Sequence, residues 1–212
     1  MNMEKKFELT DNFIINAFGV KLFQIKCTKS FKYAKEGDLG GYVEKDENLD
    51  QESDAWVSGN AEVYGNARVY GNAWVYGNAW VSGDARVYGN ARVYGNAWVS
   101  GDAWVSGDAR VSGDARVYGN AEVYGNAWVS GDAEIDNNNK HCGFDCFGSA
   151  NRHTHAYLTK ENKVEITCGC FRGSIEEFEK RVEETHSGTI YEKQYKAIID
   201  VIKIKFGLTD LI

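Results

Sequence analysis

Cysteine and histidine are the residues of this chain that could bind a metal ion or attack a substrate, and most of them lie in its last third. Thiolate and imidazole are the ligands that zinc prefers, and a cysteine beside a histidine could instead supply a nucleophile and its base. The spacings Cys-x3-Cys and Cys-x-Cys differ from the paired Cys-x2-Cys of common zinc sites, and small cysteines also fit a tight turn beside Gly169. We therefore predict that the chain binds no metal and no cofactor. A zinc site and a Cys–His nucleophile remain as two alternatives. The residues concerned are Cys142, Cys146, Cys168, Cys170, His141, His153 and His155.

The composition of the whole chain limits the classes of function. Its 212 residues suffice for one or two small domains, and its net charge of −7 argues against a general nucleic-acid binder, which needs a basic face. No apolar run has the length of a membrane span, and the first thirteen residues lack the apolar region of a signal peptide. Five cysteines, an odd number, fit reduced thiols better than a disulfide framework. We expect a cytoplasmic protein that binds neither nucleic acid nor membranes.

A six-residue repeat fills the middle of the chain and must position the other elements. Ala recurs every six residues from Ala55 to Ala133, Val follows two residues later from Val57 to Val129, and Ile135 closes the series. Because the apolar residues of Ala-x-Val alternate, they share one face of a short strand. The Gly-Asn or Gly-Asp that follows tolerates left-handed backbone angles and marks a corner. Three such sides make one coil of a prism, and coils stack at ~4.8 Å.

The unit Val69-Tyr-Gly-Asn-Ala-Trp74 resembles the hexapeptide repeat of left-handed parallel β-helices, over about 80 residues. The resemblance implies left-handed winding, which the spacing alone does not give and against which the usual rule for parallel crossovers would argue. Hexapeptide-repeat acyltransferases use a His as general base, usually on a loop that interrupts the coils or at a subunit interface. Here the coils are uninterrupted, and all four His follow residue 135. We predict that the protein is not an enzyme, with a hexapeptide-repeat acyltransferase as the alternative.

The residues on either side of each Val are predicted to point outward in columns, one for each side of the prism. The first column is Trp56, Trp74, Arg92, Arg110 and Trp128; the second is Glu62, Trp80, Trp98, Arg116 and Glu134; the third is Arg68, Arg86, Trp104 and Glu122. Beside them run columns of Tyr and Ser, such as Tyr76 with Tyr94.

These columns contain all six Trp of the chain, and two interpretations of them stay open. The ladders could only stiffen the solenoid through cation–π and ionic contacts between coils. They could instead form a binding surface, because Trp, Tyr and Arg are the residues that anchor protein interfaces. The predicted binding surface consists of Trp56, Trp74, Trp80, Trp98, Trp104, Trp128, Tyr76, Tyr94, Arg86, Arg92, Arg110 and Arg116.

The segment before the repeat indicates a β cap. Residues 21–27 alternate as a strand does, residues 36–43 form a turn-rich entry, and the six-residue register continues backwards with Leu49 in the place of Ala. This stretch, with Gly37-Asp-Leu-Gly-Gly-Tyr-Val-Glu44 and Asn48-Leu49 before Ala55-Trp-Val57, resembles the YdcK-type β-solenoid proteins of bacteria and phages. The resemblance covers about residues 18–135; it implies the solenoid fold and no activity.

The segment after the repeat indicates a small ββαα module. Beyond a linker at 136–140, residues 155–158 and 164–168 flank a turn and predict a hairpin. Ser174-Ile-Glu-Glu177 is a capping box that opens a helix, and a second helix is expected at about 190–205. The expected inward residues are Ile175, Phe178 and Val182 of the first helix, and Tyr195, Ile198 and Ile202 of the second. Residues 147–149, 168–173 and 184–186 resemble a small domain of phage and prophage proteins.

Together these patterns predict a mainly β protein. Residues 1–54 form an N-terminal β cap with the entry coil, 55–136 a left-handed parallel β-helix, and 137–212 an α+β module. The predicted function is a non-enzymatic scaffold or protein-binding solenoid encoded by a phage or prophage. One version inhibits a host protein in the host cytoplasm. The expected partner is another protein or further copies of the chain, for example in a trimer.

Overall fold

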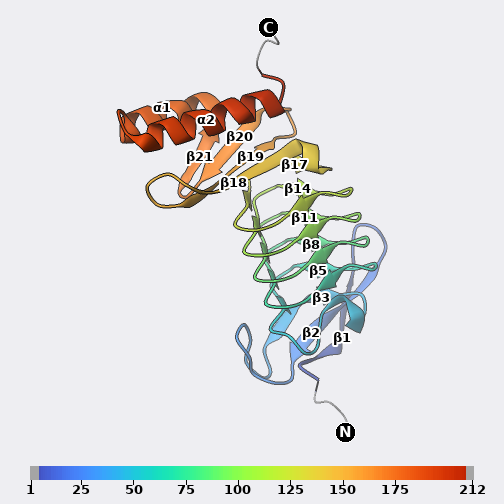
Figure 1. Ribbon diagram of the computed structural model, residues 1–212. Helices are drawn as coiled ribbons and strands as arrows, with labels where there is room; N and C mark the ends of the chain where they lie inside the picture. Colours follow the sequence, from blue (N-terminus) through green and yellow to red (C-terminus); the bar gives the residue numbers. More distant parts are fainter. Residues whose placement is uncertain (1–4, 209–212) are drawn as a thin grey trace.

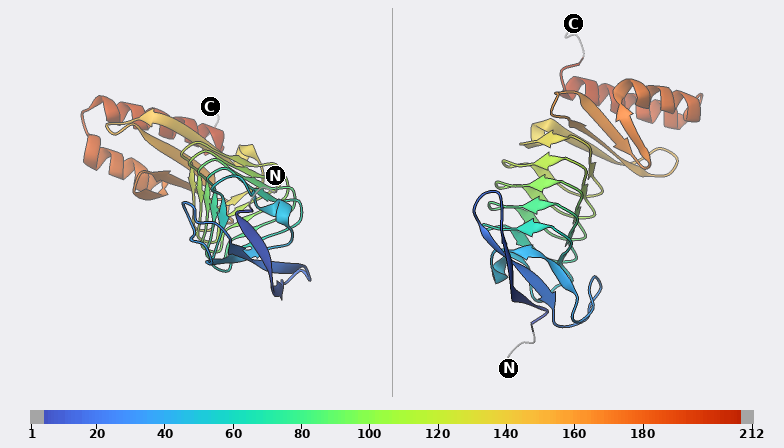
Figure 2. Two further views of the ribbon diagram at one scale, coloured as in Figure 1. Left: turned by 90° about the horizontal axis from the view of Figure 1, so that it is seen from below. Right: turned by 180° about the vertical axis from the view of Figure 1, so that it is seen from behind.

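The repeat folds into a stack of parallel β coils between an antiparallel N-terminal cap and a C-terminal module of strands and helices (Figure 1). The computed structural model describes residues 5–208. In the views of Figure 2 the C-terminal module projects beyond one side of the stack. The predicted mainly β solenoid with a small α+β module is confirmed, and its left-handed winding stays a prediction. No helix within 5–208 is long and apolar enough to cross a membrane.

Three sheets run along the stack, one on each side of the prism. The long sheet contains β1 (Phe7–Ile15), β2 (Lys21–Cys27), β3 (Leu39–Val43), β5 (Glu62–Val63), β8 (Trp80–Val81), β11 (Trp98–Val99), β14 (Arg116–Val117) and β17 (Glu134–Ile135). The five-stranded sheet contains β4 (Trp56–Val57), β7 (Trp74–Val75), β10 (Arg92–Val93), β13 (Arg110–Val111) and β16 (Trp128–Val129). The four-stranded solenoid sheet contains β6 (Arg68–Val69), β9 (Arg86–Val87), β12 (Trp104–Val105) and β15 (Glu122–Val123). The three predicted columns are therefore correct.

The interior of the stack is a column of small aliphatic side chains. Every repeat Ala from 55 to 133 and every repeat Val from 57 to 129 is buried, together with Ile135. Each coil donates its backbone N–H groups to the next, as Trp104 N–H does to the Ala121 carbonyl at 2.9 Å. Burial of apolar surface and these interstrand bonds make neighbouring coils depend on each other.

The corners are held by glycine and asparagine. Gly107 has φ +66°, which an L side chain rarely adopts, so the corner requires glycine. Beside the glycines, asparagine side chains bond from coil to coil: Asn72 donates to Asn90 at 3.1 Å, and Asn90 donates to Asp108 at 3.0 Å. Because a carboxylate has no N–H to donate, this ladder ends at Asp108.

The N-terminal cap continues the long sheet with antiparallel strands. The predicted strand at 21–27 is confirmed as β2, and β1 pairs with it. A register shift between Leu9 and Phe13 breaks the alternation of β1, which is why the sequence pattern did not reveal that strand. The first open coil end is closed by Lys6, whose ammonium group donates to the carbonyls of Asp50, Ser53 and Ala55 at 2.6, 2.7 and 2.7 Å.

The entry coil differs from the predicted register. Leu49 pairs with Val69 and not with Ala67, so the prediction that Leu49 takes the place of an Ala is wrong. This coil contains two extra residues between Leu49 and Val57, which pair with Val69 and Val75, and the short 3-10 helix η1 (Asp46–Asn48) precedes this insertion. The buried Asn48 side chain donates to the carbonyls of Gly65 and Ala67 at 3.1 and 2.9 Å. It thereby satisfies acceptors of the next coil where the strand pairing is interrupted.

The C-terminal module places two helices on one face of an antiparallel sheet. Its elements are η2 (Asn138–Lys140), β18 (His141–Phe147), β19 (Arg152–Leu158), β20 (Val164–Cys168), β21 (Phe171–Ser174), α1 (Ile175–His186) and α2 (Ile190–Lys205). The predicted hairpin is β19–β20, and the capping box at Ser174 and the expected inward helix residues are confirmed. The outer strands β18 and β21 were not predicted. A register shift interrupts β18, with Cys146 at φ +64°, and β21 has only four residues.

Strand β19 joins the module to the solenoid through its alternating side chains. Tyr157 packs into the core of the stack, whereas its neighbour Ala156 packs under the helices. The Tyr157 hydroxyl lies 3.3 Å from the Ser130 backbone nitrogen of the last coil. One strand therefore serves two cores, because successive side chains point to opposite faces of a sheet.

Candidate binding face

Aromatic residues of the N-terminal cap cover the tryptophans that lie toward the cap on two sides of the prism. We call this end of the stack, next to the cap, the lower end. Phe18 contacts Trp80 and Trp98 on the long sheet, with ring centroids at 5.7 and 5.9 Å. On the five-stranded sheet, Phe31 and Tyr33 cover the first two tryptophans. Their centroids lie 5.3 Å from Trp56 and 5.1 Å from Trp74 respectively. Sequence analysis missed this cover, and its signal was the presence of aromatic residues in otherwise polar loops before the repeat.

Several residues of the predicted binding surface are consequently withdrawn from solvent. Trp56 is only 2% exposed, so its place in an exposed surface was a wrong prediction. Trp74, Trp80, Trp98 and Trp128 are half-buried. Trp104 is 38% exposed, and no other tryptophan of the chain belongs to the exposed class. Contact with the cap gives Trp56, Trp74, Trp80 and Trp98 a structural role that the repeat pattern does not reveal.

The cationic residues of the predicted surface stay exposed on all three sides. Arg92 and Arg110 are adjacent on the five-stranded sheet, beside the stacked rings of Tyr76 and Tyr94 at 4.9 Å. On the long sheet, the Arg116 guanidinium lies 5.7 Å from the Trp98 ring. These contacts are the coil-to-coil ladders expected from the sequence, and they stabilise the stack modestly.

The four-stranded solenoid sheet is the side whose outward column is exposed throughout. We call this surface the open face. Within 5–208, no aromatic contact joins the cap or the C-terminal module to it. The open face consists of Arg68, Arg86, Trp104 and Glu122, all exposed, with the neighbouring column Tyr70, Tyr88, Ser106 and Tyr124.

Charges on the open face are arranged unevenly. Arg68 and Arg86 lie side by side on neighbouring strands, and like charges in register destabilise a sheet. Neither forms any of the salt bridges found within residues 5–208. The Arg86 guanidinium lies 5.1 Å from the Trp104 ring. The face therefore carries two cationic groups that form no salt bridge in the described part of the chain, although acidic residues of the entry segment line the same groove.

Aromatic rings give the open face a flat, amphipathic surface. The rings of Tyr70 and Tyr88 stack at 4.9 Å with an angle of 4° between them. Tyr124 is 64% exposed at the upper end of the face. Such rings combine large contact areas with a hydroxyl that can bond to a partner, which is the chemistry of a protein-binding surface.

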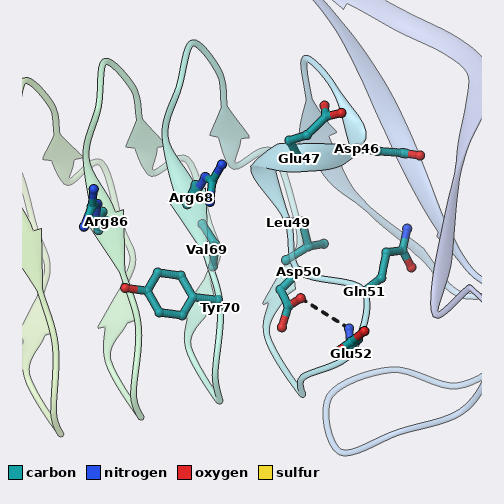
Figure 3. Close-up of a pocket in the computed structure, with 10 residues that line it drawn as sticks. All are labelled: Asp46, Glu47, Leu49, Asp50, Gln51, Glu52, Arg68, Val69, Tyr70 and Arg86. Carbon is teal, nitrogen blue, oxygen red and sulfur yellow. Dashed lines mark hydrogen bonds between the residues drawn. The ribbon is translucent and has the colours of Figure 1, made fainter.

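A groove borders the lower end of the open face (Figure 3). It has a volume of about 660 Å³ and lies between the entry coil and the first strands of this sheet. Acidic residues of the entry segment form one wall, and Arg68, Tyr70 and Arg86 form the other. The acidic residues are Asp46, Glu47, Asp50 and Glu52.

The cysteines and histidines lie away from this face. No group of three or more His, Cys, Asp or Glu within 5–208 has the geometry to hold a metal ion. The buried thiol of Cys168 accepts from the Thr154 hydroxyl at 3.3 Å, while Cys146 and Cys170 are exposed. Burial raises the pKa of the Cys142 thiol to about 11, so it stays protonated at neutral pH.

A buried pair of histidines lies where the module meets the last coil. His141 Nδ1 and His155 Nε2 are 3.1 Å apart, and His155 Nδ1 is 3.5 Å from the Trp128 carbonyl. Burial lowers the pKa of His141 to about 4 and that of His155 to about 3. Both rings are therefore neutral at pH 7 and form part of the junction.

Comparison with known families identifies the repeat. The YdcK beta solenoid repeat matches residues 61–77, 67–83, 85–101 and 115–131. A search of curated proteins finds no match to this chain. All four matched segments lie within the stack of coils. The solenoid of this protein is therefore a YdcK-type β-solenoid, a repeat architecture of the scaffold type.

Proposed function

We propose that this protein is a non-catalytic scaffold whose open face binds another protein chain. The observation that carries the proposal is the exposure of the whole outward column of one side, while the cap covers Trp56, Trp74, Trp80 and Trp98 on the other two. The open face offers guanidinium, indole and phenol groups, which anchor interfaces. It contains neither His nor Cys, the usual bases and nucleophiles.

Site-specific photo-crosslinking tests this proposal in the cells that make the protein. A benzophenone side chain replaces Trp104 in one variant and Arg92 in a matched control, since both positions are exposed and directly precede a buried Val. We expect a discrete protein adduct from position 104 and none from position 92. Equal adducts from both positions, or none from 104, would contradict the proposal.

A narrower version of the proposal concerns the biological setting. The resemblance of residues 147–149 and 168–173 to a phage protein domain supports an origin in a phage or prophage. In this version the partner is a host protein that the solenoid inhibits in the host cytoplasm. Mass spectrometry of the adduct tests it, because the adduct must then contain a host protein. An adduct made only of copies of this chain would contradict this version.

A further inference from the structure

We propose that the open face binds a second copy of this chain in the antiparallel direction, about a twofold axis between β9 and β12. This inference rests on the proposed function and names a second copy, in place of a host protein, as the partner of the same face. The axis lies in the interface, parallel to the four-stranded solenoid sheet and perpendicular to the stacking direction, so each copy contributes the same residues to the interface. The evidence lies in the order of charges along the face.

The outward column complements itself when one copy is reversed. From the lower to the upper strand it has the order Arg68, Arg86, Trp104, Glu122. Reversal places Arg68 opposite Glu122 of the second copy, and Arg86 opposite the indole of Trp104. Each pair occurs twice because of the twofold axis. Carboxylate and aromatic faces are the two partners that a guanidinium prefers.

The residues beyond the two ends of the column continue this order. At the lower end, the acidic η1 lies next to β6; in Figure 3 Glu47 lies on the side of Arg68, whereas Asp46 points away from it and pairs with Lys5 at 2.7 Å. At the upper end, the Glu122 backbone N–H donates to Asn138 of η2 at 2.8 Å, and η2 ends at Lys140. In the reversed arrangement Glu47 of one copy therefore faces Lys140 of the other, whose ammonium group lies 3.1 Å from Asp136 within its own copy.

The unbalanced charge of the face favours this arrangement over others. Arg68 and Arg86 repel each other and form no salt bridge within residues 5–208. A parallel second copy would place arginine on arginine. A cyclic trimer needs two different complementary patches on each copy, whereas the open face complements itself. We therefore infer a dimer in place of the trimer that hexapeptide-repeat proteins suggest.

The size of the face indicates a weak dimer. Four strands at ~4.8 Å give a height of about 20 Å, and a side of about six residues has a similar width at ~3.3 Å per residue. Two such faces bury about 800 Å² together, below the roughly 1,200 Å² of stable complexes. We therefore expect rapid exchange and a dissociation constant on the order of 10 to 100 μM.

Analytical ultracentrifugation of the full chain at low salt tests the dimer and its direction. We expect the wild type to change from monomer to dimer between about 5 and 500 μM, which brackets the expected constant. R68E and E122R should each lose dimerisation at least tenfold, because each brings like charges together. The matched control R92E, on the five-stranded sheet, should dimerise like the wild type.

Mixing the two charge-reversed variants gives the decisive measurement. When R68E meets E122R, the new carboxylate faces the new guanidinium, and at the other end Glu122 of R68E faces Arg68 of E122R. An equimolar mixture should therefore dimerise although each variant alone does not. Soluble heterodimers would also show that both variants are folded. Two monomers that remain separate on mixing would refute the antiparallel register.

A monomeric wild type at the highest concentration would overturn the second copy as the partner. In that case a crosslink from position 104 to a different protein would still support the proposed binding face. Dimers that persist in R68E, E122R and W104S alike would show that copies associate elsewhere, and would also overturn the inference. Added salt should lower the fraction of wild-type dimer, because it screens the exposed ion pairs between the two copies.

Discussion

The stacking of the corners predicts different costs for two glycine substitutions that share the same backbone strain. Gly107 and Gly125 occupy the same corner of successive coils, with φ values of +66° and +65°. A Cβ on Gly107 would lie 2.9 Å from the backbone nitrogen of Gly125 and 3.0 Å from its carbonyl oxygen. A Cβ on Gly125 would have no atom within 4 Å. The pair therefore separates backbone strain from the contact between coils.

The expected magnitudes follow from these two terms. Placing Ala at positive φ destabilises the folded state by about 1–2 kcal/mol. Because Ala leaves the unfolded chain fewer conformations than Gly, the substitution also stabilises the protein by about 0.4–1 kcal/mol. G125A should thus destabilise by about 1 kcal/mol. G107A carries the same cost and a clash with the backbone of the next coil, which cannot rotate away. Overpacking of this kind adds about 1–3 kcal/mol, so G107A should destabilise by roughly 2–4 kcal/mol in total.

Guanidinium chloride unfolding, followed by circular dichroism, measures the difference. With an m-value of about 5 kcal/mol/M for a chain of this size, the midpoint of G107A should lie about 0.4 M below that of G125A. Hydrogen exchange of the Asp108 amide gives a local test, because it donates to the Gly125 carbonyl at 2.8 Å. Equal midpoints would refute the argument that backbone contact between coils requires glycine at position 107. Wild-type stability of G125A would refute the estimate of backbone strain.

Two further predictions concern the ends of the stack. The pKa values of His141 and His155 are lowered by burial to about 4 and about 3, from an ordinary 6.5, so below pH 6.5 the unfolded chain binds protons that the folded chain excludes. The free energy of unfolding should therefore decrease as the pH is lowered, by about 2 kcal/mol per histidine between pH 7.5 and pH 5. In H155Q the free energy of unfolding should depend less steeply on pH. An unchanged pH dependence in this variant would show that other groups cause it. At the opposite end, K6M removes the ammonium group that bonds to three carbonyls and should destabilise by about 3 kcal/mol. K5M, which removes only an exposed ion pair to Asp46, should leave the unfolding midpoint unchanged, and equal effects of both substitutions would contradict the capping role of Lys6.

The solenoid could be predicted because its tertiary contacts repeat with the sequence. Each residue of the stack meets the residue one coil away, as Trp98 meets Arg116, so the period alone gives the strand register. The small Ala and the Val give the buried face, and Gly gives the corner. The helices were also predictable, since the capping box at Ser174 and the spacing of Phe178 and Val182 act within a few residues of each other.

The tertiary structure decided what the repeat does not encode. Nothing in the period shows that Phe31 lies over Trp56, that Leu49 pairs with Val69, or that the rings of two distant histidines meet. These contacts join segments of different kinds, without a repeat to fix the distance between partners. The sequence by itself determined the coils and the order of residues in each column. Only the packing of the cap and the C-terminal module decided which columns are covered, because each buried aromatic residue needs a neighbour from another part of the chain. This packing left exposed the side that contains Arg68, Arg86, Trp104 and Glu122.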